Sequence, residues 1–261
     1  MLQACLNGGR DKSFHAATPL TPSELAMDAR AVVEAGAQQL HIHSRDAVGR
    51  ESLHPDDTAR ALEAIRASVP GIPVGVSTGW WIAPRGRARQ QLIRAWQVLP
   101  DYVSINLIEE DAAEIIDLVL GKGVGVEAGL WSPRDAERFV ANPNARDCLR
   151  VLIEIKEQEL SAGAEAVRQI MEILDRAEIR LPRLLHGLEN TMWPFYREAL
   201  RLKLDTRIGL EDGKRLPSGA EAEGNADLIR AARALAPERA ILSASATSKS
   251  AQNVSGKEDQ C

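Results

Sequence analysis

Short apolar runs alternate with longer segments of helical spacing along nearly the whole chain. The apolar runs are bounded by turn residues and read as strands, whereas the longer segments repeat their apolar residues at intervals of three and four. Strands are predicted over residues 2–7, 39–44, 73–77, 102–107, 124–129, 150–155, 183–186 and 206–210. Helices are predicted over about 21–35, 55–67, 85–96, 111–120, 132–140, 164–176, 191–201 and 222–235.

This order repeats one unit, a strand followed by a helix, eight times. Eight such units in a chain of this length predict a (β/α)8 TIM barrel, which we expect to form a single domain over residues 1–242. A doubly wound open sheet is the alternative, but no GxGxxG motif follows the first strand to favour it. Residues 243–261 are rich in Ser, Ala, Asn and Lys without periodicity, and we expect them to be a disordered tail.

Composition narrows the class of protein. The 261 residues are 44% hydrophobic and carry a net charge of -5, so there is no overall basic field to attract nucleic acid or a membrane surface. No apolar run approaches the ~18 residues of a membrane span, and the first residues lack a secretory signal pattern. The three cysteines form no CxxC pair, which favours the reducing cytoplasm as the compartment.

The segment Leu40–Asp46, LHIHSRD, places two histidines two residues apart at the end of a predicted strand. On a strand this spacing points His41 and His43 to the same face. Neutral imidazole is the commonest metal ligand in proteins, so the pair predicts half of a metal site. The alternative is one core histidine and one hydrogen-bonded loop histidine.

Polar residues close every predicted strand, although the strand bodies are mostly Val, Ile and Leu. In a barrel the carboxyl ends of the strands form the active site, so we expect these residues to surround one pocket. They are Asn7, Arg10, His41, His43, Arg45, Ser77, Thr78, Ser104, Asn106, Glu127, Glu154, Lys156, His186, Arg207, Glu211 and Asp212.

The last predicted strand ends in RIGLED. Arg207 and Glu211 share strand parity, so both are expected to face the mouth of the barrel. Glu211 would complete a set of two histidines and one glutamate, the kind of set that holds a catalytic zinc with open positions. Asp212 follows at the strand end, where it can act as a base beside the metal. The alternative is a surface salt bridge between Arg207 and an acid.

HIHSRD, STG, SIN, a glutamate on the fifth strand and RIGLED, in this order on eight strand–helix units, resemble the β-keto acid cleavage enzymes. The opening NGGR is similar to that family's first-strand turn, and the resemblance covers about residues 1–235. It implies a transferase with a barrel fold and a divalent metal, usually Zn2+. Members condense a β-keto acid with acetyl-CoA and release acetoacetate and a new acyl-CoA, and they are typically homotetramers. A dimer is the alternative assembly.

The resemblance also implies roles for individual residues. His41, His43 and Glu211 correspond to the metal ligands, and Asp212 to the group that starts deprotonation, with Arg207 beside it. Ser77, Ser104 and Asn106 correspond to residues that bind the substrate, and we group Thr78 with them. Glu127 corresponds to the fifth-strand glutamate, which either relays a proton or orients a neighbour.

Arg10 departs from the family pattern. Members that act on an amino-bearing keto acid carry a glutamate in the first-strand turn, where it meets the ammonium group. A cation in this place repels an ammonium and attracts a carboxylate. We therefore expect a β-keto acid with an anionic or polar distal end. The alternative is that Arg10 neutralises a neighbouring acid.

Three other functions are compatible with parts of the pattern. A class I aldolase would use Lys156 as a Schiff-base lysine, although nearby glutamates favour a charged ammonium there. A metal-dependent amidohydrolase also uses an HxH pair, but on the first strand and with further histidines on the fifth and sixth. A barrel that binds a ligand without catalysis is the third alternative.

Overall fold

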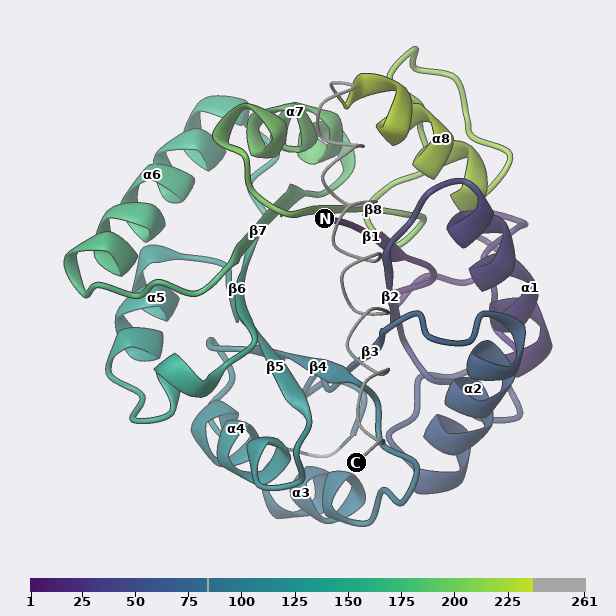
Figure 1. The fold of residues 1–261 in the computed structure, drawn as a ribbon, viewed down its shortest axis with the longest axis horizontal. Coiled ribbons are helices and arrows are strands. Elements are labelled where there is room, and N and C mark those ends of the chain that lie inside the picture. The colour runs from purple at the N-terminus through teal and green to yellow at the C-terminus, as the bar shows by residue number, and fades with distance from the viewer. Residues whose placement is uncertain (84, 237–261) are drawn as a thin grey trace, which may run out of the picture.

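Eight parallel strands close into a barrel that is surrounded by eight helices in the described part of the chain, residues 1–83 and 85–236 of the computed structural model (Figure 1). The strands are β1 Leu2–Cys5, β2 Gln39–Ile42, β3 Val74–Ser77, β4 Tyr102–Asn106, β5 Gly125–Leu130, β6 Arg150–Ile155, β7 Arg183–Gly187 and β8 Thr206–Ile208. The helices are α1 Pro22–Glu34, α2 Pro55–Ser68, α3 Arg87–Arg94, α4 Ala112–Leu120, α5 Pro133–Val140, α6 Leu160–Arg176, α7 Met192–Leu202 and α8 Asn225–Leu235. Two 3-10 turns, Ala145–Asp147 and Glu189–Thr191, complete the elements.

The sheet runs in the order β7-β6-β5-β4-β3-β2-β1-β8. A parallel bridge from Leu184 to Asp205, the residue before β8, joins the two ends of this order. The fold is therefore the predicted (β/α)8 barrel, and the open doubly wound alternative is wrong because the sheet closes on itself. No helix in the described ranges is both long and apolar enough to cross a membrane.

Local sequence signals place the helices. Thr21 caps α1 by accepting a hydrogen bond from the Glu24 backbone, and the Glu24 carboxylate accepts one from the Thr21 backbone. This reciprocal pair is a capping box, and Pro22 fills the first helical position. The Ser132 hydroxyl caps α5 by accepting a hydrogen bond from the Asp135 backbone, and Pro133 follows it. The predicted helix starts therefore agree with the structure to within a few residues.

The two faces of the barrel wall differ in chemistry. Alternate residues of β1, Leu2 and Ala4, pack outward into the apolar layer beneath the helices, while Gln3 and Cys5 point into the barrel. The interior of the barrel is consequently polar, and the main apolar core lies between the sheet and the helix ring.

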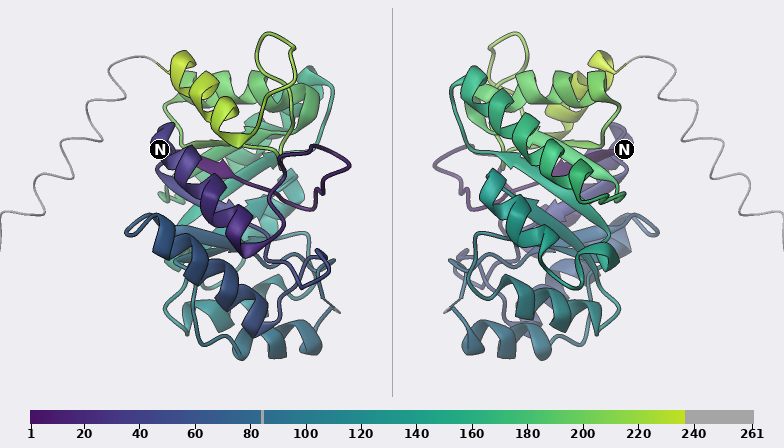
Figure 2. Two further views of the ribbon diagram at one scale, coloured as in Figure 1. Left: turned by 90° about the vertical axis from the view of Figure 1, so that its right-hand side faces the viewer. Right: turned by 90° about the vertical axis from the view of Figure 1, so that its left-hand side faces the viewer.

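Loops after the strands project from one end of the barrel. Figure 2 shows the loop after β1 and the loop after β8 extending from this end side by side. The Lys214 ammonium donates to the Phe14 carbonyl at 3.1 Å and joins these loops, which lie 200 residues apart. The predicted boundary at residue 242 and the predicted tail 243–261 lie outside the described residues.

Candidate active site

A layer of polar residues crosses the barrel interior below the pocket and holds Glu127. Its carboxylate lies 2.9 Å from the Arg150 guanidinium and accepts a hydrogen bond of 2.8 Å from Gln3. The Tyr102 ring fills this layer because Gly75 has no side chain; a Cβ there would lie 1.9 Å from the ring. Glu127 is fully buried and is the third residue of β5, which runs on to Leu130. The prediction that it ends a strand is wrong, and it does not line the pocket.

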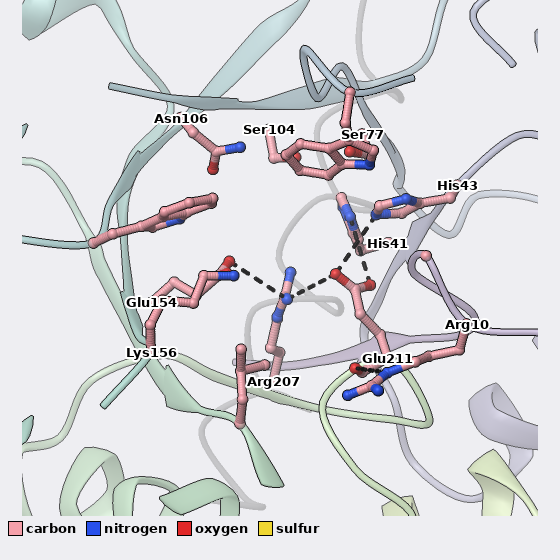
Figure 3. A pocket seen from close by; sticks show the side chains of 14 residues that line it. Arg10, His41, His43, Ser77, Ser104, Asn106, Glu154, Lys156, Arg207 and Glu211 are labelled. Carbon is pink, nitrogen blue, oxygen red and sulfur yellow. Dashed lines mark hydrogen bonds and ion pairs between the residues drawn. The ribbon is translucent and has the colours of Figure 1, made fainter. Parts of the chain in front are cut away.

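The pocket opens above this layer, at the carboxyl ends of the strands (Figure 3). It is lined by Gly9, Arg10, His41, His43, Ser77, Trp81, Ser104, Asn106, Trp131, Glu154, Lys156, Leu188, Arg207 and Glu211. Eight of the eleven residues named above as metal, catalytic or substrate-binding candidates belong to this wall, and Thr78, Glu127 and Asp212 do not.

His41, His43 and Glu211 come together on one side of the pocket. The Nε2 atoms of His41 and His43 lie 3.7 and 3.6 Å from the two carboxylate oxygens of Glu211, and all three ligand atoms fall within 4.8 Å of one another. Ligand atoms about 2.1 Å from a shared ion would be roughly 3.4 Å apart in a tetrahedral site. Glu211 Oε2 is buried and has no hydrogen-bond partner among the described residues. This donor set fits a divalent metal.

Glu211 reaches the histidines by a route different from the predicted one. β8 ends at Ile208, so Glu211 lies in the following turn and not on a strand that continues to Leu210. The side chain passes over Gly8, whose φ is +51° and where a Cβ would lie 2.4 Å from Glu211 Cγ. A glycine is therefore required in the first-strand turn both for the backbone conformation and for the space that Glu211 occupies.

Two contacts orient His43. Asn7 brackets its backbone, accepting a hydrogen bond from the His43 N–H and donating one to the His43 carbonyl, each at 2.9 Å. The Glu51 carboxylate lies 2.5 Å from Nδ1 and itself accepts from the Trp81 indole at 3.2 Å. Trp81 stacks on the His43 ring with an interplanar angle of 27°. A proton on Nδ1 leaves Nε2 free to face Glu211 and the pocket.

The charges of this group differ from residue to residue. Burial lowers the pKa of His41 to about 3, so its imidazole is neutral. Burial opposes the charge on His43, but the Glu211 and Glu51 carboxylates raise its pKa to about 9. Burial would also raise the pKa of Glu211, yet Arg207 and the two histidines hold it well below the usual range. A metal requires an ionised carboxylate and neutral imidazoles, so Glu211 and His41 already have the required charge, whereas His43 would release a proton when a metal binds.

Arg207 occupies the floor of the pocket and is surrounded by acids. Its guanidinium lies 2.9 Å from Glu211, 3.1 Å from Asp212 and 3.7 Å from Glu154. The surface salt bridge considered as an alternative for Arg207 is wrong, because only 2% of its side chain is exposed.

Asp212 lies behind Arg207 and is fully buried. Its carboxylate accepts a hydrogen bond from the Cys5 thiol at 2.9 Å and lies 3.4 Å from His186 Nδ1. The other ring nitrogen of His186 is 3.5 Å from Glu154, which does line the pocket. Burial and Arg207 disfavour the charged His186, but the two carboxylates raise its pKa. Asp212 is thus connected to the pocket through His186 and Glu154.

Ser77, Ser104 and Asn106 line the wall opposite Arg207 (Figure 3). Ser77 ends β3 and Asn106 ends β4, as the sequence predicts, whereas Ser104 lies two residues before the end of β4. Thr78 does not join them, because its hydroxyl donates to the Ser104 carbonyl at 2.7 Å and turns into the barrel wall. It ties β3 to β4, which sequence position alone did not indicate.

Arg10 lines the pocket from the loop after β1. Its guanidinium forms an ion pair with Glu189 and lies 4.2 Å above the Phe14 ring. About a third of the side chain is exposed. The predicted cation is therefore in place, and the neighbouring acid of the alternative interpretation is present as well.

The sequence did not indicate roles for Glu154 and Trp131, which line the pocket, or for Glu51, which contacts His43 from outside it. Glu154 lies on β6 and Lys156 follows its last residue, two positions on, and this spacing was the available signal. They form an ion pair, and the Lys156 ammonium lies 4.0 Å above the Trp131 ring. Both contacts favour a charged ammonium, which is not the nucleophile that a class I aldolase needs.

Comparison with known proteins places this barrel in a family. Residues 1–181 match the profile of the beta-keto acid cleavage enzymes. The chain is 27% identical to a 3-oxoadipate:acetyl-CoA acetyltransferase of Cupriavidus necator, over 87% of this chain and 84% of that protein. A shorter match, 32% identical over 26% of this chain and 25% of the relative, is to a 3-keto-5-aminohexanoate cleavage enzyme of Fusobacterium nucleatum.

Solved structures share the fold at lower identity. A ternary complex of ObcA with a C4-CoA adduct and oxalate superposes with a TM-score of 0.65 and 18% identity, covering 88% of this chain and 64% of that chain. A type I 3-dehydroquinate dehydratase from Clostridium difficile superposes with a TM-score of 0.60 and 10% identity, over 90% of this chain and 91% of the other. The matched profile spans more than half of the chain, and we conclude that this protein belongs to the beta-keto acid cleavage enzyme family.

Proposed function

We propose that this enzyme condenses a β-keto acid with acetyl-CoA to give acetoacetate and a new acyl-CoA, using a divalent metal, most simply zinc. The observation that carries the proposal is the meeting of His41, His43 and Glu211 on one side of a pocket that is also lined by Ser77, Ser104 and Asn106. The acetyl-CoA named for the Cupriavidus necator relative supports the choice of co-substrate.

The bonds exchanged define what the pocket must do. The bond between C2 and C3 of the keto acid breaks, and C2 with its carboxylate is joined to the acetyl carbonyl carbon. The thioester bond of acetyl-CoA breaks, and the CoA sulfur bonds to the acyl carbon released from the keto acid. Atoms and electrons balance without an oxidant or reductant.

A metal held by His41, His43 and Glu211 would act as a Lewis acid that polarises a carbonyl oxygen. The remaining work falls to the side chains around it. Arg207 offers positive charge on the pocket floor, where negative charge develops as C2 loses its proton. Ser77, Ser104 and Asn106 present hydrogen-bonding groups suited to a carboxylate, which would fix the position of C2.

We assign the proton acceptor role to Asp212. Because this carboxylate does not line the pocket, a proton taken from C2 would pass through Glu154 and His186, which stand between the pocket and Asp212. Glu127 is given a positioning role, since its contacts to Gln3 and Arg150 hold the layer under Arg207.

The substrate class follows from Arg10. Its guanidinium faces the pocket from the β1 loop and suits a keto acid with a second carboxylate or another polar group at the distal end. The 3-oxoadipate of the relative's name is such a dicarboxylic keto acid, which supports this assignment.

The cellular setting is part of the proposal. Cys5 and Cys148 are free and buried, in keeping with a reducing cytoplasm. We expect a homotetramer, or a dimer, as in the family that the sequence resembles. Light scattering of the purified protein measures the mass directly.

The decisive experiment supplies acetyl-CoA labelled with 13C in both acetyl carbons, together with a panel of β-keto acids. We expect acetoacetate that carries both labels and an unlabelled new acyl-CoA in equal amount, detected by mass. Labelled acetate or free CoA without a new thioester would indicate hydrolysis and contradict the proposal. Borohydride inactivation in the presence of a keto acid, with an adduct on Lys156, would favour the aldolase alternative.

A further inference from the structure

The side-chain amide of Asn106 is held in one orientation by a residue outside the pocket. Its Nδ2 atom donates to the Glu109 carboxylate at 3.0 Å, and its Oδ1 atom packs against Gly129, where a Cβ would lie 2.6 Å away. A flipped amide would place Oδ1 against the Glu109 carboxylate, and the two oxygens would repel each other. Nδ2 has a second N–H, so Asn106 can donate a hydrogen bond to a ligand while Glu109 holds the first.

Glu109 is itself an unusual residue, a fully buried glutamate paired with a fully buried arginine. The carboxylate lies 2.5 Å from Arg89, which comes from α3, and both side chains have an exposed fraction of 0%. Arg89 also lies 3.6 Å from Asp111. Burying an ion pair costs desolvation energy that a pair of apolar residues would not incur, so stability alone does not explain the pair.

A second contact links Glu109 to the pocket rim. The oxygen that accepts from Asn106 also accepts from the Trp80 backbone at 3.3 Å, in the loop that follows β3. The next residue of that loop, Trp81, stacks on His43. The same carboxylate oxygen therefore touches the carboxylate-binding wall of the pocket and the loop that covers a metal-ligand histidine.

We propose that Glu109, held by Arg89, is a positioning residue that orients the Asn106 amide so that an N–H faces the carboxylate of the β-keto acid. The inference rests on the proposed function, in which Asn106 binds that carboxylate. Glu109 does not touch the substrate, and its effect passes through Asn106.

Two matched double variants distinguish the effect of losing the hydrogen-bond acceptor of Asn106 from the effect of losing the Arg89–Glu109 ion pair. Arg89→Met with Glu109→Gln removes both charges but keeps an oxygen for Asn106, whereas Arg89→Met with Glu109→Met removes the oxygen as well. Neither leaves Arg89 or Glu109 as an unpaired, fully buried charge, and Asp111 keeps the hydrogen bond that it accepts from the Gly86 backbone, so both are expected to fold. We expect a KM for the keto acid within about threefold of the parent for the first variant. For the second we expect KM to rise about tenfold, the loss of one hydrogen bond to a charged group.

Repeating both double variants in an Asn106→Ala background tests whether Glu109 affects KM through Asn106. If Glu109 acts through Asn106, the difference between the two double variants disappears in this background. A difference that persists would mean that the Trp80 loop transmits the effect, and equal KM values in the parent background would mean that the acceptor is irrelevant. Either result overturns the inference. Asp111→Asn, which changes the other acid near Arg89, is the control and is expected to leave KM unchanged.

A spectroscopic readout keeps this test separate from the enzymatic activity. The side-chain amide signals of Asn106 in a 15N-correlated NMR spectrum are identified by their loss in Asn106→Ala. We expect these signals to shift in the Arg89→Met, Glu109→Met protein and to stay near the parent position in Asp111→Asn. Unshifted signals overturn the orientation argument even if turnover is observed. An absence of turnover in the parent enzyme, with the shift present, counts against the proposed function alone.

Discussion

Glu51 places its carboxylate 2.5 Å from Nδ1 of His43, the nitrogen that faces away from the pocket. The two residues are eight positions apart, and an antiparallel bridge between Arg45 and Glu51 folds the loop back to bring them together. A carboxylate on the outer nitrogen of an imidazole ligand fixes the ring orientation and increases the basicity of the inner nitrogen.

Glu51→Gln is therefore expected to weaken metal binding about 10–100-fold while leaving the fold intact. Competition with a chelator, followed by metal analysis, measures the affinity. Glu63→Gln, on the exposed face of α2, is the control and should bind metal as the parent does. Equal affinity in the Glu51 variant and this control would show that the carboxylate does not support the site.

His41→Ala and Asp212→Asn are expected to inactivate the enzyme for different reasons. Loss of His41 removes one of three ligands, so the purified protein should contain little metal. Asp212→Asn keeps the ligands and should retain metal, while kcat falls about 10²–10⁴-fold if the carboxylate accepts the proton. Metal content and steady-state rates on both proteins separate the two effects. An active Asp212→Asn enzyme would contradict the assignment of the base.

Arg10→Glu is expected to reverse the preference for the distal group of the keto acid. The parent should favour substrates with a distal carboxylate, and the variant should disfavour them by about tenfold or more in kcat/KM because like charges then face each other. Glu189→Gln removes the acid that pairs with Arg10 and should strengthen the parent preference. If the substrate panel gives the same order for all three proteins, Arg10 does not select the distal group.

Asp28 makes the stability of the barrel depend on pH. Burial raises the pKa of its carboxyl to about 7, although a hydrogen bond from Asn225 opposes the shift. Because the folded-state value lies above the unfolded value, the folded state binds the proton more tightly, and its stability falls as pH rises from about 4 to 7. Asn225 also donates to the Leu6 carbonyl and accepts from the Leu210 N–H, so it connects Asp28 to the backbone just after β1 and β8.

Asp28→Asn should remove the loss of folding stability that the parent shows as pH rises. We expect the variant and the parent to be about equally stable at pH 4.5. At pH 8 the variant should be more stable by roughly 1–3 kcal/mol, less than the full linkage value because the side chain is half-buried. Urea unfolding at the two pH values measures the difference. Asp56→Asn, an exposed residue of α2, is the control, and an equal gain at both pH values would refute the role of Asp28.

The barrel fold and part of the site, including His41, His43, Ser77 and Ser104, can be predicted from the sequence because they depend on local periodicity. Alternation of side chains along a strand predicts that His41 and His43 face the same way, and parallel strands in a barrel bring Ser77 and Ser104 to one end. The apolar periods of strands and helices differ enough that eight repeats specify the fold class. Helix caps such as Thr21 with Glu24 then locate the helix starts.

Tertiary structure alone decided which polar residues face the pocket. Strand parity does not reveal how far a strand runs, so Glu127 was expected at an end of β5 although it lies in the buried layer below the pocket. Glu211 reaches the histidines from a turn, because β8 stops at Ile208 and Gly8 leaves space for the side chain.

Contacts between distant segments have no signature in a single sequence. The Thr78 hydroxyl points into the barrel wall because it donates a hydrogen bond to the Ser104 carbonyl of the neighbouring strand. Glu51, in the loop after β2, contacts His43, and Glu109, in the loop after β4, accepts a hydrogen bond from Asn106. Local propensity determined the strands and helices of this protein, whereas the closure of the barrel determined which side chains share the pocket with His41 and His43.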